Sequence, residues 1–286
     1  MVLVTGASGQ VGIHLLRALA KKRIATRAWV HRTQHESLVA EAGATEVFVG
    51  DLTSEADAEA AMRGIDTVYY ICNAANPQED EIGYLLIKQA KREGIKSFVY
   101  HSVLHSLLSD MPHHQKKQAV EKALVDSGLP YVILQPAVFL QMFAPGLKSV
   151  RNGGPFLQKF YTSEGTRMSF VDLRDYADAA AELASFRRYW FGTYELCGEG
   201  AYSLNDLESL LSRLTGRSVT SAFISDADFL AASHTELSSY AGQTLLTMFR
   251  HYNQKSFCGS CFTLTQLLGR KPVAVEDYFR EALLSV

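Results

Sequence analysis

The sequence predicts a doubly wound α/β fold, with a parallel sheet between two layers of helices, and a smaller, mostly helical C-terminal lobe. Glycines at positions 6, 9 and 12 separate a short apolar run from a segment of helical spacing. Apolar segments of strand length then alternate with segments of helix length up to residue 136. Strands joined in this way need right-handed crossovers and a sheet buried on both faces. Beyond residue 136 this rhythm loosens, which predicts the second lobe.

The N-terminal glycine-rich turn is the most informative motif. Residues 1–4 are apolar, and Val11, Leu15, Leu16 and Leu19 repeat at helical spacing directly after the glycines. Such a turn lets the chain reverse sharply, lets a pyrophosphate approach the backbone, and lets the helix pack closely on the strand. The phosphates would lie on the free N–H groups of the helix N-terminus. We therefore predict a Rossmann dinucleotide-binding domain rather than a glycine-rich turn without a ligand.

The other elements of the first part follow in order. Strands are expected at residues 26–30, 47–49, 67–72, 97–101 and 131–134, and helices at 54–63, 81–93 and 114–127. Gly128 stops the last of these helices, and Pro136 ends the last strand because proline has no amide hydrogen to donate.

The second part is more irregular. Glycines and prolines concentrate within residues 143–167, which indicates loops over a cleft. A helix at 174–185 and a strand at 193–197 are expected to rejoin the main sheet, and the chain is mostly helical from Leu204. We therefore predict two domains. The dinucleotide-binding domain comprises 1–142, with 166–200 returning to it, and a discontinuous substrate or partner lobe comprises 143–165 and 201–286.

Composition and charge disfavour several classes of function. The chain has 286 residues, with 28 Lys and Arg against 30 Asp and Glu, so no overall field favours nucleic acid or a membrane surface. No apolar stretch approaches the roughly 20 residues of a membrane span, and the N-terminal strand is unlike a signal peptide. Four cysteines are too few for a disulfide framework in this length. We expect a cytoplasmic protein without direct nucleic-acid binding or membrane association.

The end of the second strand indicates which dinucleotide binds. An acidic residue usually stands there, about 20 residues after the glycines, and binds the ribose hydroxyls. Here residues 29–34 read WVHRTQ, and no carboxylate comes before Glu36. Because Arg32 can bind a 2′-phosphate that an acid would repel, NADP(H) is favoured over NAD(H). The alternative for Arg32 is a solvated loop charge, and Asp51 after the third strand either meets the adenine or forms a turn.

Further motifs accompany the glycine loop. They are His31-Arg32, Gly50-Asp51-Leu52, HSVLH at 101–105, HHQKK at 113–117, SGLPY at 127–131, Gln135-Pro136, MSFVD at 168–172, Arg174-Asp175 and LLGRKP at 267–272. Together these motifs, which span nearly the whole chain, resemble the NmrA-like family, a branch of the atypical and extended short-chain dehydrogenases. That family includes NADP-binding redox sensors and transcriptional co-regulators, quinone reductases, triphenylmethane reductases and plant ether or isoflavone reductases.

The motifs and the resemblance together imply a set of cofactor contacts. These are Gly6, Ser8, Gly9, Gln10, Val11, Gly12, His31, Arg32, Asp51, Leu52, Asn73, Lys117 and Pro136.

The family's catalytic motif is altered in this chain. Short-chain dehydrogenases generally use a Tyr-x-x-x-Lys pair, in which Lys lowers the phenol pKa and holds the nicotinamide ribose while Tyr exchanges the proton. At this spacing the chain has His113 and Lys117. The resemblance implies a ribose contact for Lys117 and a substrate-orienting role for Ser102. His113 or His114 either donates a proton near neutral pH or only opens a helix after Pro112.

Two other groups of residues carry weaker hypotheses. Cys258 and Cys261 have the spacing of a redox dithiol, but no second cysteine pair completes a zinc site, so we expect two ordinary thiols and no metal. Tyr161 is an alternative phenol. Four residues near the expected cleft would hold a flat apolar substrate or belong to the core: Phe139, Met142, Phe143 and Phe156.

Two functions remain open. The favoured one is an NADPH-dependent reductase of a small aromatic or quinone-like acceptor, because a quinone needs only weak proton donation and tolerates the loss of the Tyr. The other is a non-catalytic NADP(H) redox sensor that presents the small lobe to a protein partner. A sugar-nucleotide epimerase is disfavoured because its chemistry relies on the Tyr. The sequence leaves a homodimer open.

Overall fold

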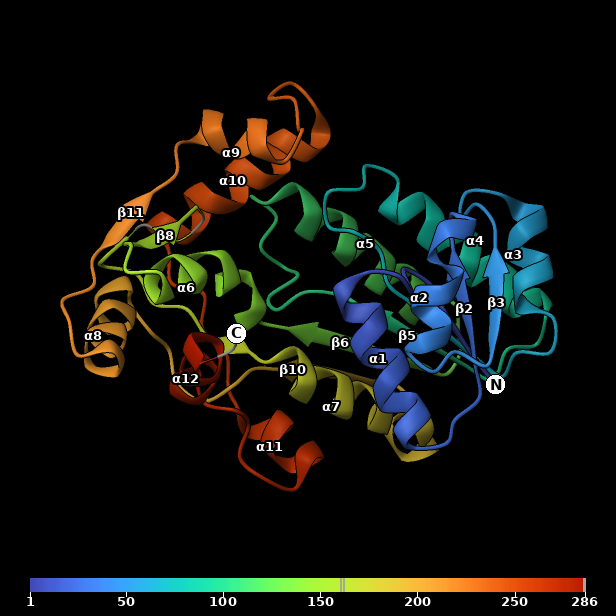
Figure 1. Ribbon diagram of the computed structural model, residues 1–286. Helices are drawn as coiled ribbons and strands as arrows, with labels where there is room; N and C mark the ends of the chain where they lie inside the picture. The colour runs from blue at the N-terminus through green and yellow to red at the C-terminus, as the bar shows by residue number, and fades with distance from the viewer. Residues whose placement is uncertain (160, 162, 285–286) are drawn as a thin grey trace. The chain divides into compact units, whose positions relative to one another are not determined.

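The computed structural model describes residues 1–159, 161 and 163–284, and its main feature is a seven-stranded sheet of order β10-β6-β5-β4-β1-β2-β3 (Figure 1). The strand pairs from β3 to β6 are all parallel. The doubly wound parallel Rossmann sheet predicted from the sequence is therefore confirmed. The strands are β1 Val2–Val4, β2 Thr26–Val30, β3 Glu46–Val49, β4 Thr67–Tyr70, β5 Ser97–His101, β6 Tyr131–Pro136 and β10 Gly192–Leu196.

Five α-helices form the crossovers between the parallel strands. They are α1 Gln10–Lys21, α2 Glu36–Glu41, α3 Glu55–Met62, α4 Glu79–Arg92 and α5 Pro112–Asp126. In α1 the buried residues recur on one face, and Ser54 caps α3 by accepting a hydrogen bond from the amide of Asp57.

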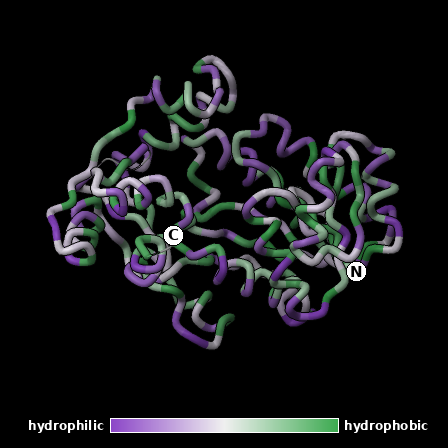
Figure 2. The backbone as a smooth tube through the Cα atoms, in the orientation of Figure 1, coloured by the Kyte–Doolittle hydropathy of each residue, from purple (hydrophilic) through white to green (hydrophobic). Residues whose placement is uncertain are grey.

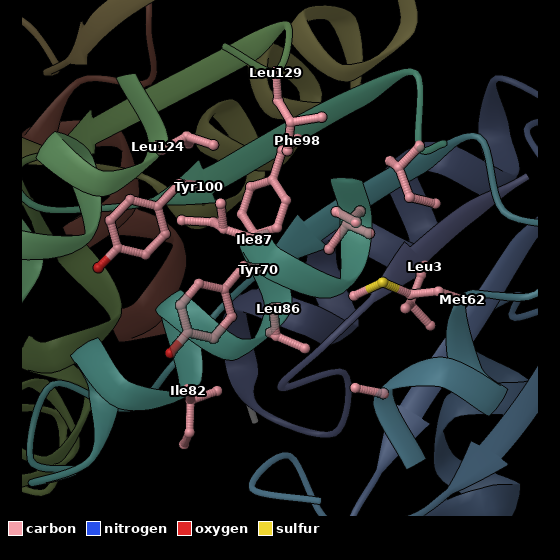
Figure 3. Close-up of a cluster of buried hydrophobic side chains, with 14 of the residues drawn as sticks. Leu3, Met62, Tyr70, Ile82, Leu86, Ile87, Phe98, Tyr100, Leu124 and Leu129 are labelled. Carbon is pink, nitrogen blue, oxygen red and sulfur yellow. The ribbon is translucent and has the colours of Figure 1, made fainter. Parts of the chain in front are cut away.

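The core of this part lies between the sheet and the helices α3, α4 and α5 (Figure 3). Leu3, Tyr70 and Phe98 come from three strands, and Leu86 comes from α4. The rings of Tyr70 and Tyr100 stack with centroids 5.4 Å apart, and Figure 3 shows their hydroxyls pointing to the same side. Figure 2 shows hydrophobic stretches along the sheet strands, as expected for strands buried on both faces.

Contacts within the chain define two compact units. Unit 1 comprises Met1–Ser109, His113–Gln135 and Tyr176–Tyr194, and unit 2 comprises Asp110–Pro112, Pro136–Asp175 and Glu195–Val286. The chain thus first passes fully into unit 2 at residue 136, whereas the predicted boundary is residue 142. The assignment of a substrate or partner role to the second lobe stays a prediction.

Unit 2 contains short strands and most of the remaining helices. Gly216 and Gly269 end α8 and α11 in the left-handed conformation that glycine adopts without strain. The elements are η2 Leu140–Phe143, α6 Ala144–Arg151, α8 Leu204–Thr215, α9 Asp226–Ala232, α10 Tyr240–Gln254, α11 Phe262–Leu268 and α12 Val275–Leu284, with β7 Val138–Phe139, β8 Phe156–Gln158, β9 Phe170–Val171 and β11 Ser221–Phe223. Helix α7 Leu173–Ser185 and the short helix η3 Arg187–Tyr189 follow β9.

Loops are predicted within residues 143–167, but α6 and β8 occupy much of this segment. Pro145 lies in the first turn of α6, where its missing amide hydrogen costs no helical bond. Gly146 allows a close approach, since a Cβ there would lie 2.6 Å from the carbonyl oxygen of Leu157. Proline and glycine are typical of loops, but here Pro145 starts the helix and Gly146 serves its packing.

Candidate functional site

The glycine loop joins β1 to α1 in unit 1. The Gly6 carbonyl accepts from the Gly9 amide at 3.0 Å, and Gly6 has φ +57°. A Cβ on Gly6 would lie 2.9 Å from the Ile71 carbonyl oxygen, so a side chain is excluded there. The Thr5 hydroxyl donates to the Ile71 carbonyl at 3.0 Å and accepts from the Ile71 amide at 2.8 Å. These bonds hold the loop against the end of β4.

The second and third glycines have different surroundings. A Cβ on Gly12 would lie 2.5 Å from the Gly6 oxygen and 2.6 Å from the Ala7 Cα, so this glycine serves the close packing of α1 on the loop. Gly9 is exposed at the N-cap of α1, and no side chain caps the helix there. A Cβ on Gly9 would lie 3.3 Å from the Gly6 oxygen. No side chain therefore competes with a phosphate for the first amides of this helix, as a phosphate-binding loop requires.

A cavity of about 370 Å³ lies beside this loop, wholly within unit 1. It brings together the ends of β1, β2 and β3, where ligands bind in open parallel sheets. Five expected cofactor contacts line it: Gly6, Ser8, His31, Asp51 and Leu52. Gly9, Gln10, Val11 and Gly12 continue the loop into α1, and Asn73 is an exposed residue after β4. Lys117 and Pro136 do not line this cavity.

Sequence reasoning missed several of the lining residues. Trp29 is a buried residue of β2, and Asn76, Gln78 and Ile82 come from the turn after β4 and the start of α4. The Asn76 side chain accepts from the Gln78 amide at 2.9 Å, which shapes this turn. The signal that could have identified Asn76, Gln78 and Ile82 is their position after β4, a buried parallel strand.

Asp51 forms a turn at the cavity wall. Its carboxylate accepts from the Thr53 amide at 2.9 Å and from the Thr53 hydroxyl at 2.8 Å. These hydrogen bonds, the amide first, lower the pKa of Asp51. The structure thus supports the turn-forming alternative for Asp51, and its contact with adenine stays a prediction.

Arg32 is exposed beside the cavity-lining His31, directly before the short helix η1 Thr33–His35. Within the part of the chain that the structure describes, no ion pair or hydrogen bond engages its guanidinium. The first carboxylate after β2, on Glu36, is exposed at the start of α2. The guanidinium is therefore available to an anion, and no acid precedes it at the strand end.

Lys117 lies in a closed environment. Its ammonium donates to Glu79 Oε1 at 2.7 Å and to the His101 carbonyl at 3.1 Å, and the Tyr100 hydroxyl donates to the same Glu79 oxygen at 2.9 Å. The side chains of Lys117 and Glu79 are 3% and 0% exposed. A buried charge needs such a partner. The ribose contact of Lys117 stays a prediction, and Glu79, which the sequence did not single out, gives this lysine a structural partner.

Ser102 is also held by a carboxylate. Its hydroxyl donates to Glu121, which also accepts from the Ser106 hydroxyl at 2.8 Å and from Gln135 Nε2 at 2.9 Å. The carboxylate thus accepts from three donors, two in the loop after β5 and one in β6. A substrate-orienting role for Ser102 stays a prediction, because its proton already has an acceptor in this arrangement.

The two histidines of α5 are buried in its first turn. Their rings pack edge to face with centroids 4.5 Å apart, and His114 Nδ1 lies 2.9 Å from the His105 carbonyl, to which it donates. The helix begins at Pro112. Burial supports the alternative in which His113 and His114 open the helix, and proton donation by either stays a prediction.

Three buried residues, Tyr69, His101 and Tyr176, form hydrogen bonds near the ends of β4 and β5. The Tyr176 hydroxyl lies 2.5 Å from His101 Nδ1 and 2.9 Å from the Tyr69 hydroxyl. Burial, followed by the charge of Lys117, holds the pKa of His101 well below its usual value. His101 is therefore neutral at physiological pH, which sequence reasoning did not predict.

The weaker hypotheses receive little support from their surroundings. Partial burial raises the pKa of Cys258, which disfavours a reactive thiolate. The buried Tyr161 hydroxyl lies 2.6 Å from the Thr166 carbonyl, so it is engaged within unit 2. Phe143 and Phe156 are core residues that pack on Phe279.

Two features of the described residues bear on membranes and metals. None of the described helices is both long and apolar enough to cross a lipid bilayer. Over the same residues, no group of three or more His, Cys, Asp or Glu side chains is arranged to hold a metal ion.

Comparison with known proteins identifies the family. The profile of the NmrA-like family matches residues 1–279. The chain belongs to the NmrA-like family. This confirms the resemblance inferred from the motifs.

Individual relatives are reductases by name. Quinone oxidoreductase 2 of Escherichia coli (strain K12) is 29% identical over 234 residues, which cover 81% of this chain and 80% of that protein. An NAD(P)H azoreductase of Xenophilus azovorans is 26% identical over 221 residues, covering 77% and 75%. The crystal structure of an NADPH-dependent quinone oxidoreductase from Escherichia coli complexed with NADPH matches with a TM-score of 0.79 and 25% identity, over 98% of both chains.

Proposed function

We propose that this member of the NmrA-like family is an NADP(H)-dependent reductase of a small aromatic or quinone-like acceptor. The observation that supports it most is the cavity at the ends of β1, β2 and β3, which is lined by Gly6 and Ser8 of the glycine loop and by His31, the residue before Arg32. The names of the relatives, quinone oxidoreductase and azoreductase, support the class of acceptor.

The residues around this cavity fit NADP(H). The uncapped N-terminus of α1 would hold the pyrophosphate, because its amides are open and Gly9 has no side chain to obstruct them. Arg32 would bind the 2′-phosphate as a bidentate partner. The exposed turn of Asn76 and Gln78 would border the adenosine half of the cofactor.

Reduction of a quinone requires little acid catalysis by the protein. The bound reduced nicotinamide supplies a hydride, and the quinone also takes up one proton to become a hydroquinone. Because the hydroquinone anion is stabilised, its protonation needs no acidic side chain, and water can supply the proton. The buried positions of His113 and Lys117 are compatible with such a reaction, since positioning supplies most of the rate.

The proposal is tested by NADPH oxidation with a panel of quinones and azo dyes, beside calorimetric titrations with NADPH and NADP⁺. We expect turnover with at least one quinone. If both cofactor forms bind and no acceptor in the panel oxidises NADPH, the reductase function is wrong and cofactor binding stands alone.

A second candidate function is a non-catalytic NADP(H) redox sensor with a protein partner. It is favoured by the buried ion pair of Lys117 with Glu79, which leaves the family's catalytic lysine engaged. A sensor must differ between its two cofactor complexes. Hydrogen exchange that is identical in the NADPH and NADP⁺ complexes would exclude it.

A further inference from the structure

We propose that a second cavity, formed wholly within unit 2, binds an apolar aromatic molecule that carries a carboxylate or carbonyl oxygen. The cavity has a volume of about 210 Å³ and lies where β8, β11, α9 and the segment before α6 meet. Its walls include Met142, Leu157, Ile224 and Phe229, with Gln158, Lys159 and Ser233 as the polar members. It shares no lining residue with the cavity of unit 1.

The size and the walls select the body of the ligand. An engineered apolar cavity of about 150 Å³ holds a benzene molecule. A cavity of about 210 Å³ therefore accommodates one or two fused rings. Thioether, aliphatic and aromatic walls favour an apolar body over a sugar or a phosphate.

Lys159 selects the polar end of the ligand. Its ammonium is half-buried and lies 5.1 Å from the centroid of the Phe229 ring. Among the residues that the structure describes, no carboxylate lies within ion-pair distance of it. Burial lowers the pKa of Lys159. A partly desolvated cation without a counter-ion is unfavourable by itself, and an anionic or carbonyl oxygen of a ligand would compensate it.

Gln158 belongs to the same wall of the cavity and is 1% exposed. The Gln158 carbonyl accepts from the Ile224 amide at 2.9 Å, and β8 pairs with β11 in parallel. The backbone of this wall is therefore fixed, and Lys159 follows it directly in the chain.

This chemistry has two sources. The occupant is either the acceptor that is reduced, in which case the inference rests on the proposed reductase function, or a separate aromatic acid. Both carry an apolar ring system with an oxygen acceptor at one end. The experiment therefore measures binding and turnover separately.

Binding is measured by calorimetric titration of the full chain with 2-naphthoate and with its neutral analogue 2-naphthamide. Lys159→Met should weaken naphthoate binding at least tenfold and naphthamide binding less than threefold, because only the charged contact is lost. Met142→Trp and Ala232→Trp fill the cavity from two sides and should abolish binding of both probes. Lys271→Met, an exposed lysine outside the cavity, is the matched control and should bind as the unmodified chain does.

All these variants should keep the NADPH affinity of the unmodified chain, because none of the changed residues lines the cavity of unit 1. Absence of probe binding in the unmodified chain, with NADPH affinity intact, would therefore count against the second cavity and not against the proposed function. The proposal is overturned if neither probe binds, or if both cavity-filling variants fold and bind naphthoate with unchanged affinity.

Turnover then identifies the source of the ligand. If the acceptor occupies the cavity, naphthoate inhibits the reduction of 2,3-dimethyl-1,4-naphthoquinone competitively, and Met142→Trp raises the KM for the quinone at least tenfold. If naphthoate binds without competing with the quinone, the cavity holds a separate aromatic acid. Both results support the site.

Discussion

Two regions of unit 1 carry family motifs, and they differ in how open they are. The glycine loop faces a cavity with an uncapped helix N-terminus, whereas the helix that carries His113 and Lys117 places both side chains in the interior. The roles of Gly9 and Gly12 depend on backbone atoms close in the chain, and Gly6 has a positive φ that glycine adopts without strain. The surroundings of Lys117 depend on Glu79, a residue of another helix. A backbone motif is therefore easier to interpret from sequence than a motif of interacting side chains.

We expect the largest effect from a substitution of Lys117, which is buried on helix α5. Lys117→Met should destabilise the protein by about 3–5 kcal/mol, because it leaves the Glu79 carboxylate buried without its cation. Urea unfolding measures the change. The double variant Lys117→Met with Glu79→Gln should recover most of the loss, and NADPH affinity should change less than about threefold if Lys117 is structural. A large loss of NADPH affinity at unchanged stability would show that Lys117 serves the cofactor.

The next effect concerns the open region. Gly9→Val should fold, because Gly9 has an ordinary φ of −78° and its side-chain direction is not blocked by other elements. NADPH binding should weaken by roughly a hundredfold or more, since the new side chain would occupy the path of the pyrophosphate. Calorimetry measures the affinity, with Gly165→Val in an exposed loop as the control. Unchanged affinity in the folded variant would move the phosphate away from this loop.

A pH experiment tests the buried surroundings of Lys117, to which His101 belongs. His101 has a lowered pKa, so below its usual value of 6.5 the unfolded chain binds a proton that the folded chain does not. Stability should therefore be unaffected by this group above about pH 6.5 and fall below it, by at most about 1.4 kcal/mol per pH unit. Unfolding free energies at pH 7 and pH 5 should differ by about 2 kcal/mol more in the unmodified chain than in His101→Gln. Parallel profiles would mean that the pKa of His101 is the same in the folded and the unfolded chain.

The smallest effect tests the cofactor preference. Arg32→Ala should lower the ratio of NADPH to NADH affinity by about tenfold, because one charge-assisted contact to the 2′-phosphate is lost. Arg63→Ala, which removes an exposed arginine of the same unit, should leave the ratio unchanged. A ratio that is equally insensitive to both changes would make Arg32 a solvated loop charge.

The sequence predicted the sheet well and the side-chain partners poorly. The strands at 26–30 and 97–101 coincide with β2 and β5, because buried parallel strands are apolar throughout and bounded by turn residues. Helix α6 was missed because Pro145 and Gly146 usually indicate loops. Neither Glu79 nor Glu121 could be identified as a partner from the sequence, since each binds a residue of a distant segment. Glu79 stands among other acidic residues at the start of a helix, and Glu121 lies inside a helix without a distinguishing motif.

The open cavity of unit 1 is expected to bind NADP(H) in preference to NAD(H). This preference is measured by calorimetric titration of the unmodified chain with NADPH and with NADH, under identical salt and pH. We expect at least about tenfold tighter binding of NADPH, because the strand end offers Arg32 and no carboxylate. Equal affinities, or tighter binding of NADH, would show that Arg32 does not select the cofactor.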